Sequence, residues 1–132
     1  MKHFLIMAMF SSLISAETLN KDSFYLIWQD EKVVLKMQKT WDEAKLYCDS
    51  LNQHSTEGWR LPSIKELQSI VDPKQYRPAI ISDFQYTTTF YFWSSTEYKK
   101  DRNQAWYVTF ESGLTNISYK TIRNSVRCVK EK

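Results

Sequence analysis

The sequence predicts an α+β domain closed by a disulfide, and three observations carry this prediction. The expected order of elements is strands, then two helices marked by capping boxes, then strands. The chain has two cysteines, Cys48 and Cys128, behind an apparent export signal. In an oxidising compartment two cysteines are interpreted first as one disulfide, which here would connect the first helix to the last strand.

Residues 1–16 have the pattern of a bacterial signal peptide. Lys2 precedes an apolar run over 4–10, and small residues end the segment at Ala16. The run is shorter than the roughly 20 apolar residues that a membrane helix requires, and we expect no transmembrane segment after cleavage. We therefore predict cleavage near Ala16, a short N-terminal segment over 17–23, and a domain over 24–130, located in the periplasm or secreted.

Size and charge limit what such a chain can do. Removal of 1–16 from the 132 residues leaves about 116, enough for one core and too few for two ordinary domains. The chain has 18 basic and 15 acidic side chains, and loss of Lys2 leaves a net charge of about +2. We expect no nucleic-acid partner. Basic residues near the C terminus would attract polyanions, but solvated strand faces are their more ordinary explanation: Lys120, Arg123, Arg127, Lys130 and Lys132.

The first expected element is a β-hairpin at the start of the domain. Residues 24–28 are rich in strand formers, and apolar residues resume over 33–37. The polar stretch over 29–32 is typical of a turn. We therefore expect the two runs to pair with each other.

Two helices follow, and each begins with a capping box. Thr-Trp-Asp-Glu over 40–43 and Ser-Ile-Lys-Glu over 63–66 have the spacing in which the hydroxyl and the carboxylate each accept from the other's backbone amide. After the first box, apolar residues recur every three or four positions as far as Leu51. Cys48 lies on this stripe, where a disulfide would be shielded. The second helix should end near 72–73.

The connection over 74–90 is irregular, with apolar residues that should anchor it to the core: Pro78, Ile80, Ile81 and Phe84. Strands are expected over 91–94, 104–110, 114–119 and 125–130. Gly113 allows a positive backbone angle, so the two middle strands should form a hairpin. In the last strand Cys128 would share a face with Val126, opposite Arg127.

Blocks of the chain from about Phe24 to Val129 resemble the Lcl C-terminal domain family, in the family's order. They are Ile27-Trp28-Gln29-Asp30, Trp41 with Glu43-Ala44 and Tyr47-Cys48, Trp59-Arg60-Leu61-Pro62 with Lys65-Glu66-Leu67, Trp93-Ser94-Ser95-Thr96, and Val126-Arg127-Cys128-Val129. The resemblance implies a C-type-lectin-like fold, with two helices, a twisted antiparallel sheet and a disulfide from the first helix to the final strand. The family is named for a collagen-like adhesin associated with sulfated glycans. The residues expected to form its structural motif are Trp41, Trp59, Arg60, Leu61, Pro62, Glu66 and Trp93.

We expect no catalytic residue, cofactor or metal. The Glu-Pro-Asn and Gln-Pro-Asp tripeptides of calcium-dependent lectins do not occur, and a polar loop is the better explanation of the nearby oxygen ligands: Thr96, Glu97, Asp101 and Asn103. Formylglycine-generating enzymes share the fold, and their Arg-Leu-Pro segment resembles 60–62. Their chemistry needs redox-active cysteines, and a buried disulfide offers no thiolate. His54, in a polar loop, lacks partners for a zinc site.

The remaining charged and aromatic residues suggest a binding surface. Arg60 needs a partner if it is half-buried, and Glu66 is a candidate for a structural ion pair. At most one or two of the five tryptophans should be exposed. The leading hypothesis is an exported, non-enzymatic binding module for glycans or polyanionic polymers, through Tyr98, Lys99, Lys100, Arg102 and Trp106. Alternatives are an oxidase related to formylglycine-generating enzymes and an envelope domain that binds other proteins, which an exposed apolar patch would favour.

Overall fold

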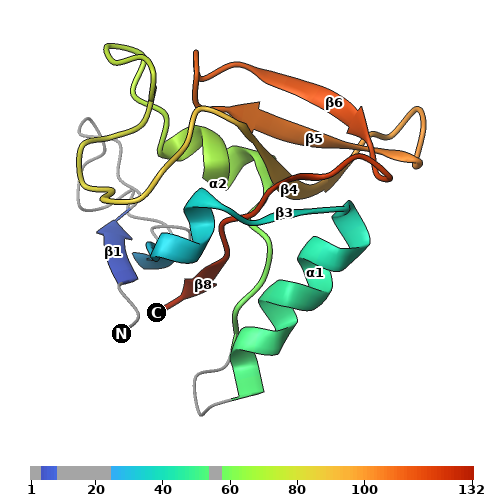
Figure 1. Cartoon of the computed structure of the whole chain (residues 1–132), viewed down its shortest axis with the longest axis horizontal. Helices are drawn as coiled ribbons and strands as arrows, with labels where there is room; N and C mark the ends of the chain where they lie inside the picture. Colours follow the sequence, from blue (N-terminus) through green and yellow to red (C-terminus); the bar gives the residue numbers. More distant parts are fainter. Residues whose placement is uncertain (1–3, 9–24, 54–57) are drawn as a thin grey trace, which may run out of the picture.

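The computed structural model describes residues 4–8, 25–53 and 58–132, and these residues form two β-sheets and two α-helices (Figure 1). One sheet has three strands in the order β1-β2-β8, and the other has five in the order β3-β7-β4-β5-β6. A disulfide joins Cys48 in the first helix to Cys128, beside the last strand. The α+β class is confirmed, as is the C-type-lectin-like arrangement with its helix-to-strand disulfide.

The five-stranded sheet is built from segments far apart in the chain: β3 (Gln38–Lys39), β7 (Asn124–Ser125), β4 (Tyr91–Glu97), β5 (Gln104–Thr109) and β6 (Thr115–Tyr119). Its pairs are antiparallel except β4 with β7, where Phe92 lies opposite Ser125. The predicted β5–β6 hairpin is confirmed. Gly113 has a φ of +81° in its turn, and a Cβ atom there would lie 2.5 Å from a Val71 methyl group.

Both helices begin where the capping boxes predict. α1 is Trp41–Ser50 and α2 is Ile64–Ser69, and in each the hydroxyl and the carboxylate of the box accept the expected backbone amides. α2 ends earlier than expected, because Val71 instead forms an isolated bridge with Ile80. This bridge fixes the irregular connection that follows the helix, whose Ile80 is buried in the core as expected.

The two helices pack against opposite faces of the five-stranded sheet, as the alternation along β4 shows. Trp93 belongs to the cluster around α1, whereas Phe92 belongs to the cluster around α2. Figure 1 shows α1 below the sheet and α2 beside β4. Neighbouring residues of one strand therefore serve two separate parts of the core. The α1 cluster contains the disulfide, and the α2 cluster is aliphatic and aromatic.

The three-stranded sheet joins the two ends of the described chain. It contains β1 (Phe4–Ala8), β2 (Tyr25–Gln29) and β8 (Val129–Glu131), and β2 pairs antiparallel with both neighbours. In the whole chain, part of the predicted signal peptide is thus strand β1. The predicted cleavage site near Ala16 and the segment 17–23 lie outside the described residues, so cleavage stays a prediction. It would remove β1 and uncover one edge of β2.

The predicted partner of the first strand is wrong. Residues 33–37 do not pair with β2; Lys32–Leu35 form a short 3-10 helix, and only β3 after it is extended. The run Val33-Val34-Leu35 lacks the alternation of a strand, and only Val34 is buried. β2 also has no edge left for a hairpin partner, because β1 and β8 occupy both.

The predicted last strand over 125–130 is also wrong as one element. It consists of β7 and β8 in different sheets, with 126–128 between them outside any strand. Val126, Arg127 and Cys128 are all buried, so the expected alternation of faces fails. A segment that crosses from one sheet to the other is covered on all sides. No helix in the described part of the chain is long and apolar enough to cross a membrane.

Candidate binding surface and its framework

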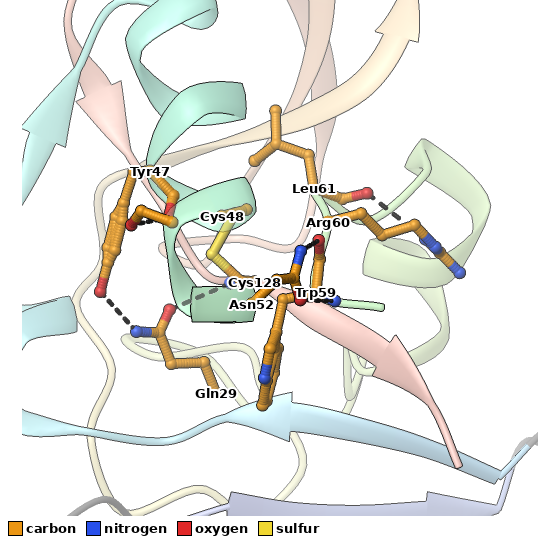
Figure 2. Close-up of a disulfide and its surroundings, with 9 residues drawn as sticks. Gln29, Tyr47, Cys48, Asn52, Trp59, Arg60, Leu61 and Cys128 are labelled. Carbon is orange, nitrogen blue, oxygen red and sulfur yellow. Dashed lines mark hydrogen bonds between the residues drawn. A yellow bond between two sulfur atoms is a disulfide. The ribbon is translucent and has the colours of Figure 1, made fainter. Parts of the chain in front are cut away.

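The disulfide is buried at the centre of a hydrogen-bonded framework (Figure 2). Gln29, at the end of β2, is fully buried, and its amide uses both ends. The Gln29 nitrogen donates to the Tyr47 hydroxyl at 2.8 Å, and the Gln29 oxygen accepts the backbone amide of Cys128 at 3.1 Å. Burial raises the pKa of Tyr47, against the hydrogen bond from Gln29. One side chain thus connects β2, α1 and the C-terminal segment.

The Trp-Arg-Leu-Pro block holds the start of α2 against β8. Asn52 accepts the Trp59 amide at 2.8 Å and donates to the Trp59 carbonyl at 3.2 Å. The Arg60 backbone pairs with Val129 through two hydrogen bonds of 2.9 Å. Leu61 and Pro62 are buried. This block therefore forms a short isolated bridge beside β8.

The expected ion pair between Arg60 and Glu66 is present. The Arg60 guanidinium makes two contacts with the Glu66 carboxylate, at 2.7 and 2.9 Å. Glu66 also accepts the Ser63 amide at 2.7 Å, which completes the capping box. Burial tends to raise the pKa of Glu66, but the hydrogen bonds from Arg60 and Ser63 outweigh burial and lower it. Both side chains are therefore committed to holding α2.

Arg127 has a structural role that the sequence did not predict. It was expected among solvated basic residues, but it is fully buried. Its guanidinium donates to the Gln29 carbonyl at 2.6 Å and to the Tyr86 carbonyl, and lies 3.5 Å from Asp30. Burial lowers the pKa of Arg127 to about 10, against the attraction of Asp30, so the side chain remains charged at neutral pH.

Asp30 completes this buried pair and anchors the irregular connection. Its two carboxylate oxygens accept the backbone amides of Gln85 and Tyr86 at 3.0 and 2.9 Å. The Arg127 guanidinium lies over the Phe84 ring, 4.5 Å from its centre. Phe84 is thus an anchor, as predicted. Asp30 and Arg127 both occur in the family blocks. In the sequence, the signal for their burial was a charged residue next to apolar ones.

The predicted binding residues come together at the turn between β4 and β5, at the right of Figure 1. Lys99, Lys100 and Arg102 are exposed. The rings of Tyr98 and Trp106 are partly exposed and meet edge to face, with centres 5.9 Å apart. We call these five residues the turn surface. Trp106 is the most exposed tryptophan, since the other four are buried.

Two further cations extend the turn surface. Lys120, after β6, lies 2.6 Å from the Glu97 carboxylate, and its ammonium is 4.0 Å from the centre of the Trp41 ring. The Lys45 ammonium, on α1, lies 4.4 Å from the same ring. The hydrogen bond from Lys120 lowers the pKa of Glu97, with a smaller contribution from Arg102. Sequence reasoning missed Lys45 because it is distant from the turn along the chain.

The C-terminal basic residues do not form one patch. Lys120 lies beside Trp41, Arg123 pairs with Glu43 of α1 at 3.4 Å, and the Lys130 ammonium lies 5.5 Å from the centre of the Trp59 ring. Arg127 is buried. These basic residues are therefore close in sequence without forming one surface, because the C-terminal segment passes from one sheet to the other.

Three of the four residues considered as calcium ligands use their side-chain oxygens within the protein. Thr96 accepts the Ile64 amide at 3.0 Å, Glu97 binds Lys120, and Asp101 accepts the Asn103 amide at 3.0 Å. Among the described residues no three His, Cys, Asp or Glu side chains are placed to hold a metal ion. His54 lies outside the described residues.

An open pocket of about 300 Å³ lies at the end of the five-stranded sheet away from the β4–β5 turn. Its lining residues are Gln38, Thr89, Phe90, Tyr91, Glu111 and Asn124. Sequence reasoning did not single out any of them. The available signal was weak, an aromatic pair at the expected start of a strand. Thr89 directly precedes this pair, and the other three polar residues come from three distant places in the chain.

Comparison with known protein families assigns most of the chain to one family. A family model described as the Lcl C-terminal domain matches residues 17–130. The match includes every described element of the fold except β1 and the last residue of β8. No curated protein matches the chain.

Proposed function

Because the chain belongs to the Lcl C-terminal domain family, which indicates an extracellular interaction module, we propose that it is an exported, non-enzymatic module that binds polyanionic glycans. The turn surface is the proposed site. The observation that carries the proposal is the gathering of cations around two partly exposed aromatic side chains at one end of the sheet. The buried disulfide is compatible with an oxidising compartment outside the cytoplasm.

The charge balance at this end supports an anionic ligand. Cations outnumber the carboxylates that lie among them, Glu97 and Asp101; the cations are Lys45, Lys99, Lys100, Arg102 and Lys120. Lys99 and Lys100 are exposed at the tip, and Arg102 is 70 % exposed although it contacts Glu97 at 3.4 Å. Such side chains can turn toward sulfates or carboxylates at little cost. Tyr98 and Trp106 add aromatic surface beside them.

A non-enzymatic role is supported by the same framework. Both cysteines of the chain are in the buried disulfide, so the oxidase chemistry of formylglycine-generating enzymes has no free thiol here. The acidic side chains nearest the turn surface are engaged by lysine, arginine or backbone amides. We assign them to structure.

The test is binding of the protein to immobilised heparin, a sulfated polysaccharide, at several salt concentrations. The variant Lys99→Ala/Lys100→Ala/Arg102→Ala should lose affinity by about tenfold or more, since each exposed charge pair contributes up to about 1 kcal/mol. Wild-type affinity should fall as salt rises, because screening weakens exposed charges.

The matched control removes the same charge elsewhere. Lys32→Ala/Lys36→Ala/Lys74→Ala changes three exposed lysines that lie outside the turn surface. Its heparin affinity should stay within about twofold of wild type. Equal losses in the two triple variants would mean that only net charge matters, and absence of heparin binding by the wild type would refute the proposal.

A further inference from the structure

The open pocket lies where four strands of the five-stranded sheet begin or end. Gln38 is in β3 and Asn124 in β7, and these two strands pair directly. Tyr91 begins β4, and Glu111 follows the end of β5. The pocket therefore depends on the order of the sheet and lies apart from the turn surface, which is at the other ends of β4 and β5.

An aromatic wall forms one side of this pocket. The Tyr91 ring is 47 % exposed, and it stacks on the Tyr107 ring with centres 4.4 Å apart and planes 16° apart. Tyr107 is itself only 8 % exposed, so it supports Tyr91 from within the fold. Phe90, 52 % exposed, adds a second aromatic side chain. A supported, half-exposed ring offers an apolar face at little entropic cost.

The rest of the lining is polar, and one of its residues has a buried donor without a partner. Asn124 is 5 % exposed, and its Nδ2 atom has no hydrogen-bond partner among the described residues. A buried amide nitrogen in this state is unfavourable. Gln38 and Thr89 offer a second amide and a hydroxyl.

The charge of the lining favours a neutral ligand. Among the described residues that line the pocket, Glu111 is the only charged one, and its carboxylate pairs with Arg77 at 3.1 Å. The described lining residues include neither lysine nor arginine, so a sulfate or carboxylate would meet Glu111 without a cation among them. The pocket thus differs in kind from the turn surface, where cations are in excess.

We propose that this pocket binds one neutral sugar ring, with the ring's C–H face on Tyr91 and its hydroxyls on Asn124, Gln38 and Glu111. Amides and carboxylates suit hydroxyl groups, because each hydroxyl both donates and accepts. A volume of about 300 Å³ is at the small end of ligand pockets and suits a single ring. This site is separate from the polyanion surface and adds a second ligand class.

The test is saturation-transfer NMR of the full chain with neutral methyl glycosides of glucose, galactose, mannose and N-acetylglucosamine. At least one should bind, with a dissociation constant on the order of 1 mM. Tyr91→Ala should weaken that binding about tenfold. The matched control is Tyr119→Ala, which removes a tyrosine that is 57 % exposed on β6 and absent from the pocket lining; it should leave binding within about twofold.

Further outcomes separate this site from the proposed function. Lys99→Ala/Lys100→Ala/Arg102→Ala should keep neutral-sugar binding, and Tyr91→Ala should keep heparin binding. If Tyr91→Ala does not fold, Gln38→Ala, which changes an exposed lining residue, should weaken glycoside binding by about threefold or more. The inference is overturned if none of the glycosides binds, or if Tyr91→Ala and Tyr119→Ala have equal effects.

Discussion

The region around the disulfide and the open pocket differ in how their buried amides are used. Gln29, beside Cys128, bonds through both ends of its amide to two other segments. Asn124, buried to a similar degree in the pocket wall, has a nitrogen without a partner among the described residues. A buried polar network becomes rigid when all of its groups are hydrogen-bonded. A buried donor without a partner instead costs free energy, so the pocket end of the sheet is less completely hydrogen-bonded than the framework.

The same difference extends to the charged residues. Arg127 and Asp30 are buried together and hold three segments in place. Lys99 and Lys100, at the tip of the β4–β5 turn, are exposed, and their rotamers are free to follow a ligand. Charge count alone therefore says little about binding in this domain, because the location of each cation decides whether it supports the fold or the surface.

Removal of the disulfide is the change that should affect the framework most. The bond closes a separation of 80 residues, and the chain-entropy model gives it about 4–5 kcal/mol of stability. Cys48→Ala/Cys128→Ala should lower the free energy of unfolding, measured by urea denaturation, by this amount. Reduction of the wild-type protein should produce a similar loss. An unchanged urea midpoint would show that the surrounding hydrogen bonds hold the framework without the covalent link.

Loss of the buried arginine should come next. Arg127→Met leaves the Asp30 carboxylate buried without its cation, which is expected to cost about 3–5 kcal/mol in urea denaturation. The exposed Arg123→Met is the control and should change stability by less than about 0.5 kcal/mol.

The double variant tests whether the cost lies in the unpaired charge. Asp30→Asn/Arg127→Met removes both charges and should be more stable than Arg127→Met alone, because the buried carboxylate is gone. The side-chain amide introduced by Asp30→Asn would retain one oxygen for the backbone amides of Gln85 and Tyr86. If the double variant is less stable than the single one, the hydrogen bonds of Asp30 matter more than its charge.

Local signals in the sequence predicted the parts of the fold that depend on neighbours in the chain. Both helix starts follow from capping boxes of four residues, and the β5–β6 hairpin follows from alternation around Gly113. The pairing of residues 33–37 was predicted wrongly because strand partners are chosen across the whole chain. β2 pairs with segments at the two ends of the described chain, which no local pattern near it indicates.

The candidate sites divide in the same way. The Arg60–Glu66 pair could be predicted because Arg60 is six positions before Glu66, just ahead of the capping box that Glu66 completes. The Asp30–Arg127 pair joins residues 97 positions apart, and the alternation over 125–130 wrongly suggested a single strand. The pocket lining converges only through the strand order β3-β7-β4-β5. The turn surface could be predicted from the sequence because its five residues lie in one short stretch of chain.

The smallest effect on stability is expected at the pocket itself, and it can be measured against a neighbour on the same strand. Tyr91 and Trp93 are two positions apart on β4 and so face the same way. Trp93 is fully buried and donates to the Lys39 carbonyl at 2.8 Å, whereas Tyr91 is half-exposed. Trp93→Ala should therefore cost about 3–5 kcal/mol, and Tyr91→Ala about 1 kcal/mol from lost stacking on Tyr107.

Urea denaturation of the two variants shows whether Tyr91 is mainly a ligand contact or mainly part of the core. If Tyr91→Ala is nearly as stable as wild type, a loss of sugar binding in that variant reports on the lost contact with the ligand. If Tyr91→Ala is as unstable as Trp93→Ala, the Tyr91 ring contributes to the stability of the fold as a core residue does. A loss of sugar binding in that variant would then not identify Tyr91 as a ligand contact. The exposed face of Tyr91 favours the first outcome, because a ring that solvent already reaches contributes less to burial.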